Sequence, residues 1–297
     1  MSETAQRSIS LVLGSGGARG LAHIGVIHWL EENDFKIDSI SGCSMGALVG
    51  GIYAAGKLDA FEKWVRTVNK FGIISMLDIA WGMSGLIRGE KIINTLVKLV
   101  GDQKIEELPI NYTAVAADIR GEKEVWIRSG SLFDAIRASI SIPLFFTPFR
   151  YNGVDLIDGG VLNPVPIAPT FGDHTEMIIA VNVGSAMDTK EELKDVHPES
   201  VEEPVSFFDK LTRFFDSSQQ NEAKSRQREW GAYDITTQAF DAMQSTIARQ
   251  KLAAYPPDHI IEISRHACGT LEFDRASEMI DLGYSKAEEF LAPKLKR

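Results

Sequence analysis

The pentapeptide GCSMG, residues 42–46, holds the side chain best placed for chemistry, Ser44. It lies between an apolar strand-like run, 37–41, and an apolar helix-like run, 47–55. A serine on a tight strand-to-helix turn has an exposed hydroxyl, and flanking glycines keep side chains out of the crowded turn. Because a serine hydroxyl is a weak nucleophile, a catalytic role also requires a general base and an oxyanion hole.

Asp158 is the candidate base. It opens the tripeptide Asp158-Gly159-Gly160, which follows an extended run, 150–157. A carboxylate within hydrogen-bond reach of a serine can act as its general base, and desolvation in an apolar cleft would raise its pKa. Asp-Gly is also a strong turn signal, so an aspartate that only shapes a turn stays open as the alternative.

The glycine-rich segment GSGGARG, residues 14–20, is the candidate oxyanion hole. It follows a predicted strand, 8–13, and precedes a predicted helix, 21–33. The first N–H groups of a helix have no partner within the helix. Because glycines have no side chain, the backbone N–H groups of such a loop can approach an anion closely. A nucleotide site is the weaker alternative, because the GxGxxG pattern fails at Arg19 and the Gly-Lys-Ser/Thr ending of a phosphate-binding loop is absent.

A triad with histidine is disfavoured. An α/β-hydrolase would place several strands before its nucleophile, whereas the 43 residues before Ser44 leave room for about two. Each histidine sits in an ordinary context and is interpreted as structural or solvated. The histidines are His23, His28, His174, His197, His259 and His266.

Alternating strand and helix patterns in the first 55 residues predict right-handed crossovers and an α/β fold with a parallel sheet. A continuous apolar run at 177–183 is typical of a central strand buried on both faces. Further strands are predicted at 111–118, 123–128 and 260–263, and further helices at 89–100, 132–139 and 273–295.

We expect a single domain, 1–297, with its motifs in a core at 8–185. Residues 186–229 are highly charged and are interpreted as an insertion or lid-like segment over one face, since loops of this length are usually functional or disordered. Within it, Phe207–Phe215 carries one apolar stripe at helical spacing. Packing onto the protein body is the favoured interpretation of the stripe, and peripheral membrane contact is the alternative.

The composition narrows the partners. The chain of 297 residues is 44% hydrophobic and carries a net charge of −10 without a basic block, which argues against nucleic acid and against general attraction to anionic membranes. Two cysteines, Cys43 and Cys268, form neither a disulfide framework nor a zinc pattern. We expect no signal peptide, no transmembrane span and a cytoplasmic location.

These segments, in this order, resemble the patatin-like phospholipase family, especially its bacterial stand-alone members and the catalytic domain of neuropathy target esterase. One departure is Ser15, which stands where many members have glycine. The matching segments are Gly14 to Gly20 with residues 21–26, Gly42 to Gly46 with 47–50, Ala138 to Pro143, and Asp158-Gly159-Gly160 with Asn163 and Pro166.

The resemblance implies a three-layer α/β/α fold and a Ser–Asp dyad without catalytic histidine, cofactor or metal. Ser44 would be the nucleophile and Asp158 the base. Backbone N–H groups of Gly16, Gly17 and Ala18 would form the oxyanion hole, with Met45 as a further donor. Arg19 and Gly20 fit the family's loop, and the basic position is expected to be structural.

The implied substrates are phospholipids, lysophospholipids or other fatty acyl esters. Three hypotheses remain open on the sequence: a serine lipid acyl hydrolase, a low-turnover lipid-binding or regulatory protein on the same fold, and a nucleotide-binding protein using the glycine-rich loop. The oligomeric state, including a homo-oligomer, also stays open.

Overall fold

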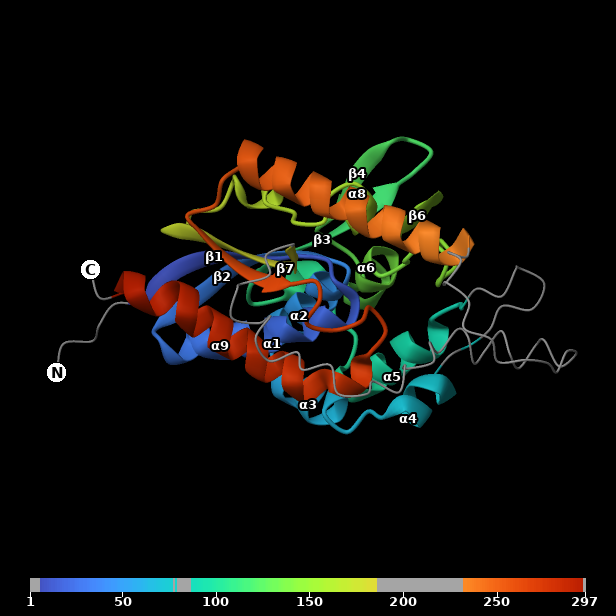
Figure 1. Cartoon of the computed structure of the whole chain (residues 1–297), viewed down its shortest axis with the longest axis horizontal. Helices are drawn as coiled ribbons and strands as arrows, with labels where there is room; N and C mark the ends of the chain where they lie inside the picture. The colour runs from blue at the N-terminus through green and yellow to red at the C-terminus, as the bar shows by residue number, and fades with distance from the viewer. Residues whose placement is uncertain (1–5, 77, 79–86, 186–231, 296–297) are drawn as a thin grey trace, which may run out of the picture. The chain divides into compact units, whose positions relative to one another are not determined.

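The computed structural model describes residues 6–76, 78, 87–185 and 232–295 (Figure 1). The chain divides into two compact units, one of residues 1–187 with 240–297 and one of residues 188–239. Of the second unit only 232–239 are described, at the start of helix α8 (Ala232–Ala254). The charged segment 186–229 and its stripe Phe207–Phe215 lie outside the described residues, so their interpretation stays a prediction.

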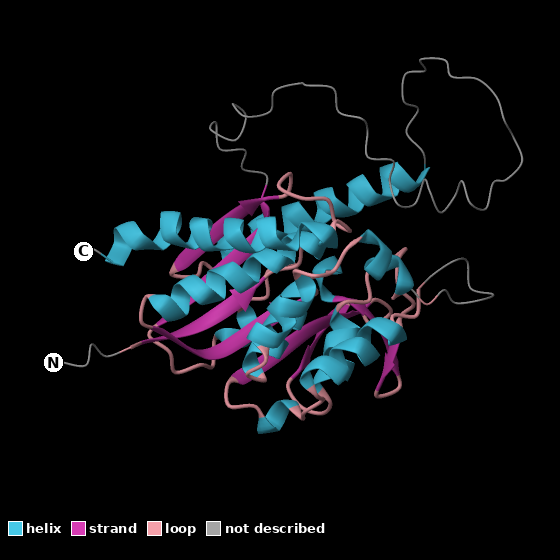
Figure 2. Cartoon of the chain, turned by 90° about the horizontal axis from the view of Figure 1, so that it is seen from below, coloured by secondary structure: helices cyan, strands magenta, loops and turns pink. Residues whose placement is uncertain are grey.

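The first unit is built on a mostly parallel sheet (Figure 2). Five parallel strands form its centre in the order β3-β2-β1-β7-β8. They are β1 (Arg7–Leu13), β2 (Phe35–Cys43), β3 (Asn111–Asp118), β7 (Met177–Ser185) and β8 (His259–Ser264).

The β3 side of the sheet is antiparallel. Strands β4 (Lys123–Ile127) and β6 (Val154–Asp158) both pair antiparallel with β3, and β5 (Phe149–Tyr151) pairs antiparallel with β6. The extended run predicted at 150–157 is therefore the hairpin β5–β6, which turns at Asn152-Gly153, where both residues have positive φ. This hairpin delivers Asp158 to the sheet.

Strand β1 shows why helices cover both faces of the sheet. Successive side chains of a strand point to opposite faces. Leu11 and Leu13 belong to the large core shared with α1 (Ala22–Glu32), α2 (Met45–Ala54) and α9 (Ala276–Leu295). Val12 belongs to a second, smaller core with Ala248 of α8. Helices α8 and α9 thus lie on opposite faces of the sheet, as Figure 1 shows.

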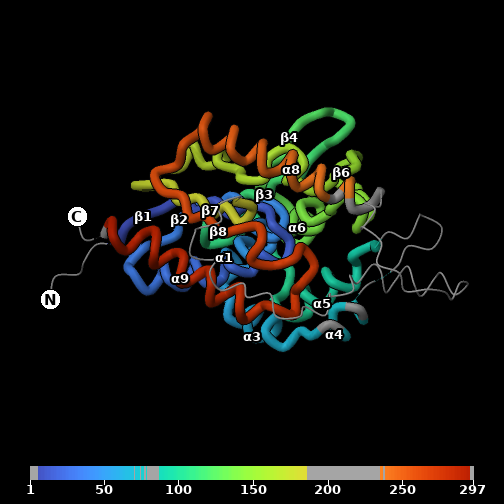
Figure 3. The backbone as a smooth tube through the Cα atoms, in the orientation of Figure 1, coloured from blue at the N-terminus to red at the C-terminus, as the bar shows by residue number. Residues whose placement is uncertain are grey.

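Helices α1 and α9 pack with their backbones in contact (Figure 3). A Cβ added at Gly25 would lie 1.9 Å from the carbonyl oxygen of Ile280, and one added at Gly283 would lie 1.9 Å from that of Ala22. Only glycine permits such close approach. This contact fixes α9 against the helix that follows the glycine-rich loop.

Three of the four remaining helices in the described ranges contribute residues to the large core. Helix α3 (Leu58–Val65) buries Leu58, Phe61 and Val65, at helical spacing. The others are α4 (Lys70–Ser75), α5 (Glu90–Val100) and α6 (Leu132–Ser139). No helix within the described ranges is long and apolar enough to cross a membrane.

The predicted strands and helices are confirmed, with ends that differ by a few residues. The helix predicted from residue 21 begins at Ala22, because residues Gly17–Leu21 of the glycine-rich loop form a 3-10 turn, η1. Helices α3, α4 and α8 were not predicted. The mixed α/β fold with a mostly parallel central sheet agrees with the prediction.

Candidate active site

Ser44 occupies a strained turn between β2 and α2. Its φ of 56° and ψ of −124° are unusual for any residue other than glycine. A Cβ added at Gly46 would lie 2.0 Å from the carbonyl oxygen of Leu13, and one at Gly42 would lie 2.5 Å from that of Gly46. Close backbone approach therefore requires glycine at both positions.

Ser139 holds the backbone of this turn. The Ser44 N–H donates to Ser139 Oγ at 2.9 Å, and the Ser139 hydroxyl donates to the Val115 carbonyl at 2.6 Å. Ser139 is fully buried at the end of α6. The sequence placed it in the 138–143 motif without a role, because this contact joins segments far apart in the chain.

The sheet register brings Asp158 to Ser44. Cys43, the residue before Ser44, pairs with Val115 on β3. Asp158 pairs with the next residue of the same strand, Ala116. The two candidate residues therefore lie at the same level of the sheet, with β3 between them.

The Asp158 carboxylate is buried and only partly hydrogen-bonded. The Gly160 N–H donates to Oδ1 at 2.7 Å, and Oδ2 makes no hydrogen bond of good geometry with the described residues. Burial raises the pKa of Asp158 to about 6, while interactions with the Ser44 hydroxyl, the Gly160 N–H and the Cys43 thiol oppose the rise. At neutral pH the group is mostly ionised and is a stronger base than an ordinary aspartate.

Cys43 is buried, as its interpretation as a small filler of the turn requires. Its Sγ lies 3.8 Å from Asp158 Oδ1, which is a weak thiol hydrogen bond. Burial and the nearby Asp158 carboxylate raise the pKa of Cys43 well above its usual value, so the thiol stays protonated and remains a donor. The sequence did not predict this contact.

Three amides of the glycine-rich loop are occupied. Gly14 donates to Val181 O, Ser15 to Pro164 O and Ala18 to Thr270 O, at 3.0, 2.8 and 2.9 Å. The Ala18 N–H, which the family resemblance offers as an oxyanion donor, is therefore already used in this structure.

The amides of Gly16 and Gly17 take part in no such loop hydrogen bond among the described residues. Gly17 has a φ of 55°, and a Cβ added there would lie 2.4 Å from the carbonyl oxygen of Thr270. Leu13 at the end of β1 pairs with Gly42, so this loop lies directly beside the Ser44 turn. In the described part of the chain, the N–H groups of Gly16 and Gly17 therefore have no backbone acceptor outside the regular elements, and both residues lie next to the Ser44 turn.

His23 makes a hydrogen bond to the backbone of the glycine-rich loop. Its Nε2 lies 2.9 Å from the carbonyl oxygen of Gly14, and the residue is fully buried. Burial lowers the pKa of His23 to about 4, so the ring is neutral at neutral pH and Nε2–H donates to this carbonyl. The sequence predicted a structural or solvated histidine here but not its contact with Gly14. His23 is the second residue of α1.

Arg19 ties the loop to the segment after β8. Its Nη1 donates to the carbonyls of Cys268 and Arg265, at 3.0 and 3.3 Å. These bonds agree with the structural role expected of the basic position. Gly20 lies against α2, because a Cβ added there would be 2.4 Å from Cβ of Met45.

The site is closed to solvent in this structure. Ser44 and Asp158 are each 1% exposed. A Cβ added at Gly160 would lie 2.7 Å from Ser15 Oγ and 2.4 Å from Nε2 of Gln244 on α8. Both side chains therefore pack closely against the turn that holds Asp158. An ester reaches Ser44 only if covering groups move.

Neither a histidine nor a metal cluster joins this site in the described part of the chain. The hydrogen bonds of His23 and His28 go to Gly14 and Glu62, and no hydrogen bond links a described histidine to Ser44. Within the described ranges, no group of three or more His, Cys, Asp or Glu side chains could hold a metal ion.

Comparison with known proteins identifies the family of the chain. Residues 11–171 match the patatin-like phospholipase family. An uncharacterized NTE family protein of Mycobacterium tuberculosis is 37% identical over 95% of this chain and 91% of its own length. Lysophospholipase NTE1 of Saccharomyces cerevisiae is 34% identical over 61% of this chain, and that of Cryptococcus neoformans is 30% identical over 96%, but these regions are only 11% and 17% of the two fungal proteins. Among solved structures, VipD from Legionella pneumophila has a TM-score of 0.48 and 15% identity, and the alignment covers 97% of this chain and 67% of VipD.

Proposed function

Because the chain belongs to the patatin-like phospholipase family, we propose that it is a serine lipid acyl hydrolase in which Ser44 and Asp158 form the catalytic dyad. The observation that carries the proposal is the buried Asp158 carboxylate at the level of Ser44. One of its oxygens is bonded to Gly160, and the other has no partner of good geometry among the described residues. A buried carboxylate with a free acceptor oxygen is suited to receive a proton from a neighbouring hydroxyl.

In the proposed reaction, Ser44 Oγ attacks the ester carbonyl carbon and its proton passes to Asp158 Oδ2. The tetrahedral intermediate collapses, the ester C–O bond breaks, and the leaving alkoxide takes the proton from Asp158. Water then attacks the acyl-serine ester and Asp158 accepts the water proton. The second tetrahedral intermediate collapses, the bond between the acyl carbon and Ser44 Oγ breaks, and Ser44 Oγ takes the proton back from Asp158 as the fatty acid leaves. The raised pKa of Asp158, about 6, suits a group that must both accept and return a proton near neutral pH.

The oxyanion would be held by backbone N–H groups of Gly16, Gly17 and Met45. The first two take part in no loop hydrogen bond with the described residues, and Met45 is the first residue of α2, where helix N–H groups lack internal partners. The N-terminal end of α2 also carries a partial positive charge. These donors would stabilise negative charge as it develops on the carbonyl oxygen.

The proposed substrates are lysophospholipids, phospholipids or other fatty acyl esters, since the fungal relatives are named lysophospholipases. The dyad reaction as written requires neither a metal nor a cofactor. A cytoplasmic location remains part of the proposal, and peripheral membrane contact through Phe207–Phe215 remains the alternative to packing of this stripe onto the protein body.

The test is hydrolysis of p-nitrophenyl esters from butyrate to palmitate by the wild type, Ser44→Ala and Asp158→Asn. We expect both variants to lose activity by about 10³-fold or more while circular dichroism shows an intact fold. The chain-length profile of the wild type would give the size of the acyl site. Undiminished hydrolysis by Ser44→Ala would refute the assignment of the nucleophile.

A low-turnover lipid-binding protein on the same fold is the second candidate, and the burial of Ser44 is the observation that favours it. Reaction with a fluorophosphonate probe separates the two, because covalent labelling requires an activated serine. Rapid labelling of the wild type that is absent in Ser44→Ala supports the hydrolase. Absence of labelling in the presence of lipid vesicles supports the binding protein.

A further inference from the structure

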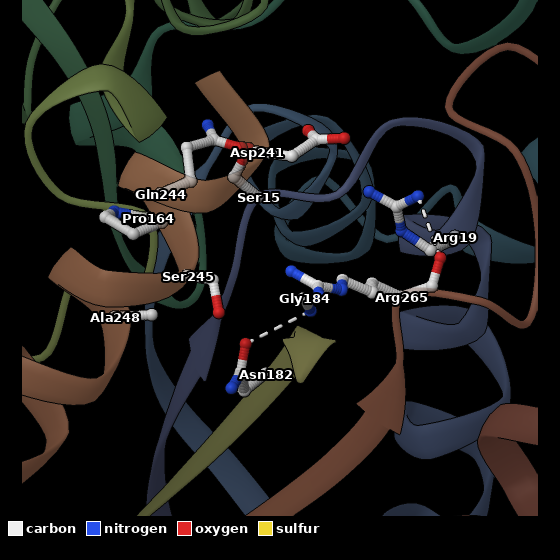
Figure 4. A pocket seen from close by; sticks show the side chains of 10 residues that line it. All are labelled: Ser15, Arg19, Pro164, Asn182, Gly184, Asp241, Gln244, Ser245, Ala248 and Arg265. Carbon is white, nitrogen blue, oxygen red and sulfur yellow. Dashed lines mark hydrogen bonds between the residues drawn. The ribbon is translucent and has the colours of Figure 1, made fainter. Parts of the chain in front are cut away.

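A small polar pocket lies beside the glycine-rich loop, between the ends of β7 and β8 and helix α8 (Figure 4). All its lining residues belong to the first unit of the chain. Its side chains are mostly hydrogen-bonding or charged. The lining residues are Ser15, Arg19, Pro164, Asn182, Gly184, Asp241, Gln244, Ser245, Ala248 and Arg265.

The pocket contains two guanidinium groups that are incompletely paired. Arg19 is 8% exposed, and its Nε is a buried donor without a partner among the described residues. The half-buried Arg265 guanidinium points between Ser245 and Gly184 (Figure 4). Its Nε donates a long hydrogen bond, 3.5 Å, to His266 Nε2, and no ion pair is found for it within the described ranges. Buried guanidinium N–H groups without acceptors are costly, so an anionic acceptor is favoured there.

A carboxylate faces the same pocket. Asp241 extends from α8, and its side chain is turned toward the side on which Arg19 lies (Figure 4). Burial raises the pKa of Asp241, and the charges of Arg19 and Arg265 oppose the rise. The pocket is therefore lined by two positively charged side chains and one carboxylate, so that it could bind a ligand carrying both charges.

The pocket adjoins the dyad. Ser15 and Gln244 line the pocket, and both side chains pack closely against Gly160. The N–H of Gly160 donates a hydrogen bond to Asp158. Ser15 also directly precedes the proposed oxyanion donors Gly16 and Gly17. A substrate with its ester carbonyl at Ser44 would therefore have its adjoining polar portion near this pocket.

The charges match a phosphate next to an ammonium group. Arginine binds phosphate through two parallel N–H bonds, and a carboxylate accepts hydrogen bonds from a primary ammonium. A quaternary ammonium instead favours aromatic faces, and no aromatic side chain lines the pocket in the described part of the chain. We propose that this pocket is the headgroup subsite for lysophospholipids with a phosphate and a primary amine, with Arg265 and Arg19 on the phosphate and Asp241 on the amine. The proposal builds on the hydrolase function and adds its substrate class.

The first test compares kcat/KM for lysophosphatidylethanolamine with that for a monoacylglycerol of the same chain. Arg265→Gln should lower the ratio of these two values by about tenfold or more, the usual effect of losing a charged hydrogen bond. Asp241→Asn should lower the ratio of lysophosphatidylethanolamine to lysophosphatidic acid, which lacks the amine. The matched control is Arg249→Gln, because Arg249 is exposed on α8 outside the pocket, and it should leave both ratios unchanged.

The second test is independent of turnover and uses the Ser44→Ala protein. Calorimetric titration with glycerophosphoethanolamine should show binding that Arg265→Gln weakens by about tenfold or more. Glycerophosphocholine should bind more weakly. Equal affinity for inorganic phosphate would overturn the assignment to an amine-bearing headgroup.

The two tests distinguish failure of this inference from failure of the hydrolase proposal. If the wild type hydrolyses neither lipid nor any ester, the hydrolase proposal fails, and the titration alone decides the headgroup site. If both lipids are hydrolysed and neither variant changes its ratio, the headgroup subsite is refuted and the hydrolase stands. Absence of glycerophosphoethanolamine binding to the Ser44→Ala protein also refutes the subsite.

Discussion

Asp158 pairs with Ala116 on β3, one residue beyond the point at which Val115 pairs with Cys43, the neighbour of Ser44. Ser44 directly follows β2 and Asp158 ends β6, and these two strands flank the same strand of one sheet. The sheet hydrogen bonds hold this arrangement, so the relative position of the two side chains does not depend on a mobile connection. Substitutions at the site can therefore be interpreted through local geometry.

We expect the Ser44→Gly protein to be more stable than the Ser44→Ala protein. At φ 56° and ψ −124°, a residue with a Cβ is strained, whereas glycine is not. After allowance for the greater chain entropy of unfolded glycine, we expect Ser44→Gly to exceed Ser44→Ala in unfolding free energy by about 1 kcal/mol. Denaturant unfolding of both proteins measures the difference.

Both Ser44 variants should be inactive, which separates the effect on stability from that on catalysis. A Ser44→Gly protein no more stable than Ser44→Ala would show that the turn is unstrained.

Activity should depend on the ionisation of Asp158. With its pKa near 6, kcat/KM should rise with pH and level off above about pH 7, because only the carboxylate can accept the Ser44 proton. The pH profile of p-nitrophenyl ester hydrolysis measures this limb. A limb centred near pH 4 would mean that Asp158 is not desolvated during catalysis.

The contribution of Asp158 to the free energy of unfolding should fall with rising pH, opposite to its effect on activity. The folded-state pKa, about 6, lies above the unfolded value of about 3.9, so the native state holds the proton more tightly between these values. The contribution of Asp158 to stability is therefore present below about pH 4 and is lost as pH rises through 6. Asp158→Asn should be more stable than the wild type at pH 7, by on the order of 1–3 kcal/mol.

The effect of Asp158 is measured as the difference in unfolding free energy between the wild type and Asp158→Asn at each pH. His23, with its pKa lowered to about 4, contributes in the opposite sense, because its stabilisation is present above about pH 6.5 and is lost as pH falls through 4. This contribution is common to the wild type and Asp158→Asn and cancels in the difference. Equal stability of the two proteins at pH 7 would argue against a desolvated Asp158.

Gly17→Ala should impair catalysis. The added methyl group would stand 2.4 Å from the Thr270 carbonyl oxygen at a φ of 55°, so the loop must shift. If Gly17 supplies an oxyanion donor, kcat should fall by about 10²-fold or more. Steady-state kinetics on a p-nitrophenyl ester gives the value.

Gly56→Ala is the matched control. Gly56 also has a positive φ, of 66°, but an added Cβ there meets no atom within 4 Å. This variant should lose about 1 kcal/mol of stability and keep full activity. Similar kcat losses in both variants would show that backbone strain alone, rather than the loop position, affects the rate.

His23 should act through the Gly14 carbonyl. His23→Ala leaves this carbonyl without its buried donor and should lower stability by about 1–3 kcal/mol and reduce kcat more than it alters KM. His23→Gln can supply an N–H in a similar place and should restore part of both. Thermal unfolding and kinetics check the pair.

His28→Ala serves as the control on the same helix, since His28 is partly exposed and bonds Glu62 rather than the loop. Its loss should leave kcat unchanged. If His23→Gln were no better than His23→Ala in either measurement, the hydrogen bond to Gly14 would not be what matters.

The order of the elements and the motifs of the site could be predicted from the amino-acid sequence. Periodicity and glycine placement are local properties, so the strands, the Ser44 turn and the glycine-rich loop were predictable from neighbouring residues. The antiparallel hairpin β5–β6 was missed, because turn residues within an extended run do not reveal which strand the run will pair with. Helix α8 was missed as well, next to the charged segment.

Which residues contact one another depends instead on strand register and on packing between distant segments. The register across β3 sets Asp158 beside Ser44, and contacts between distant segments give Ser139, Cys43 and His23 their roles. Burial, which sets the pKa of Asp158, depends on everything packed around the carboxylate and leaves no mark in the sequence nearby. The pocket of Arg19, Asp241 and Arg265 likewise exists only because α8 and the end of β8 fold against the glycine-rich loop.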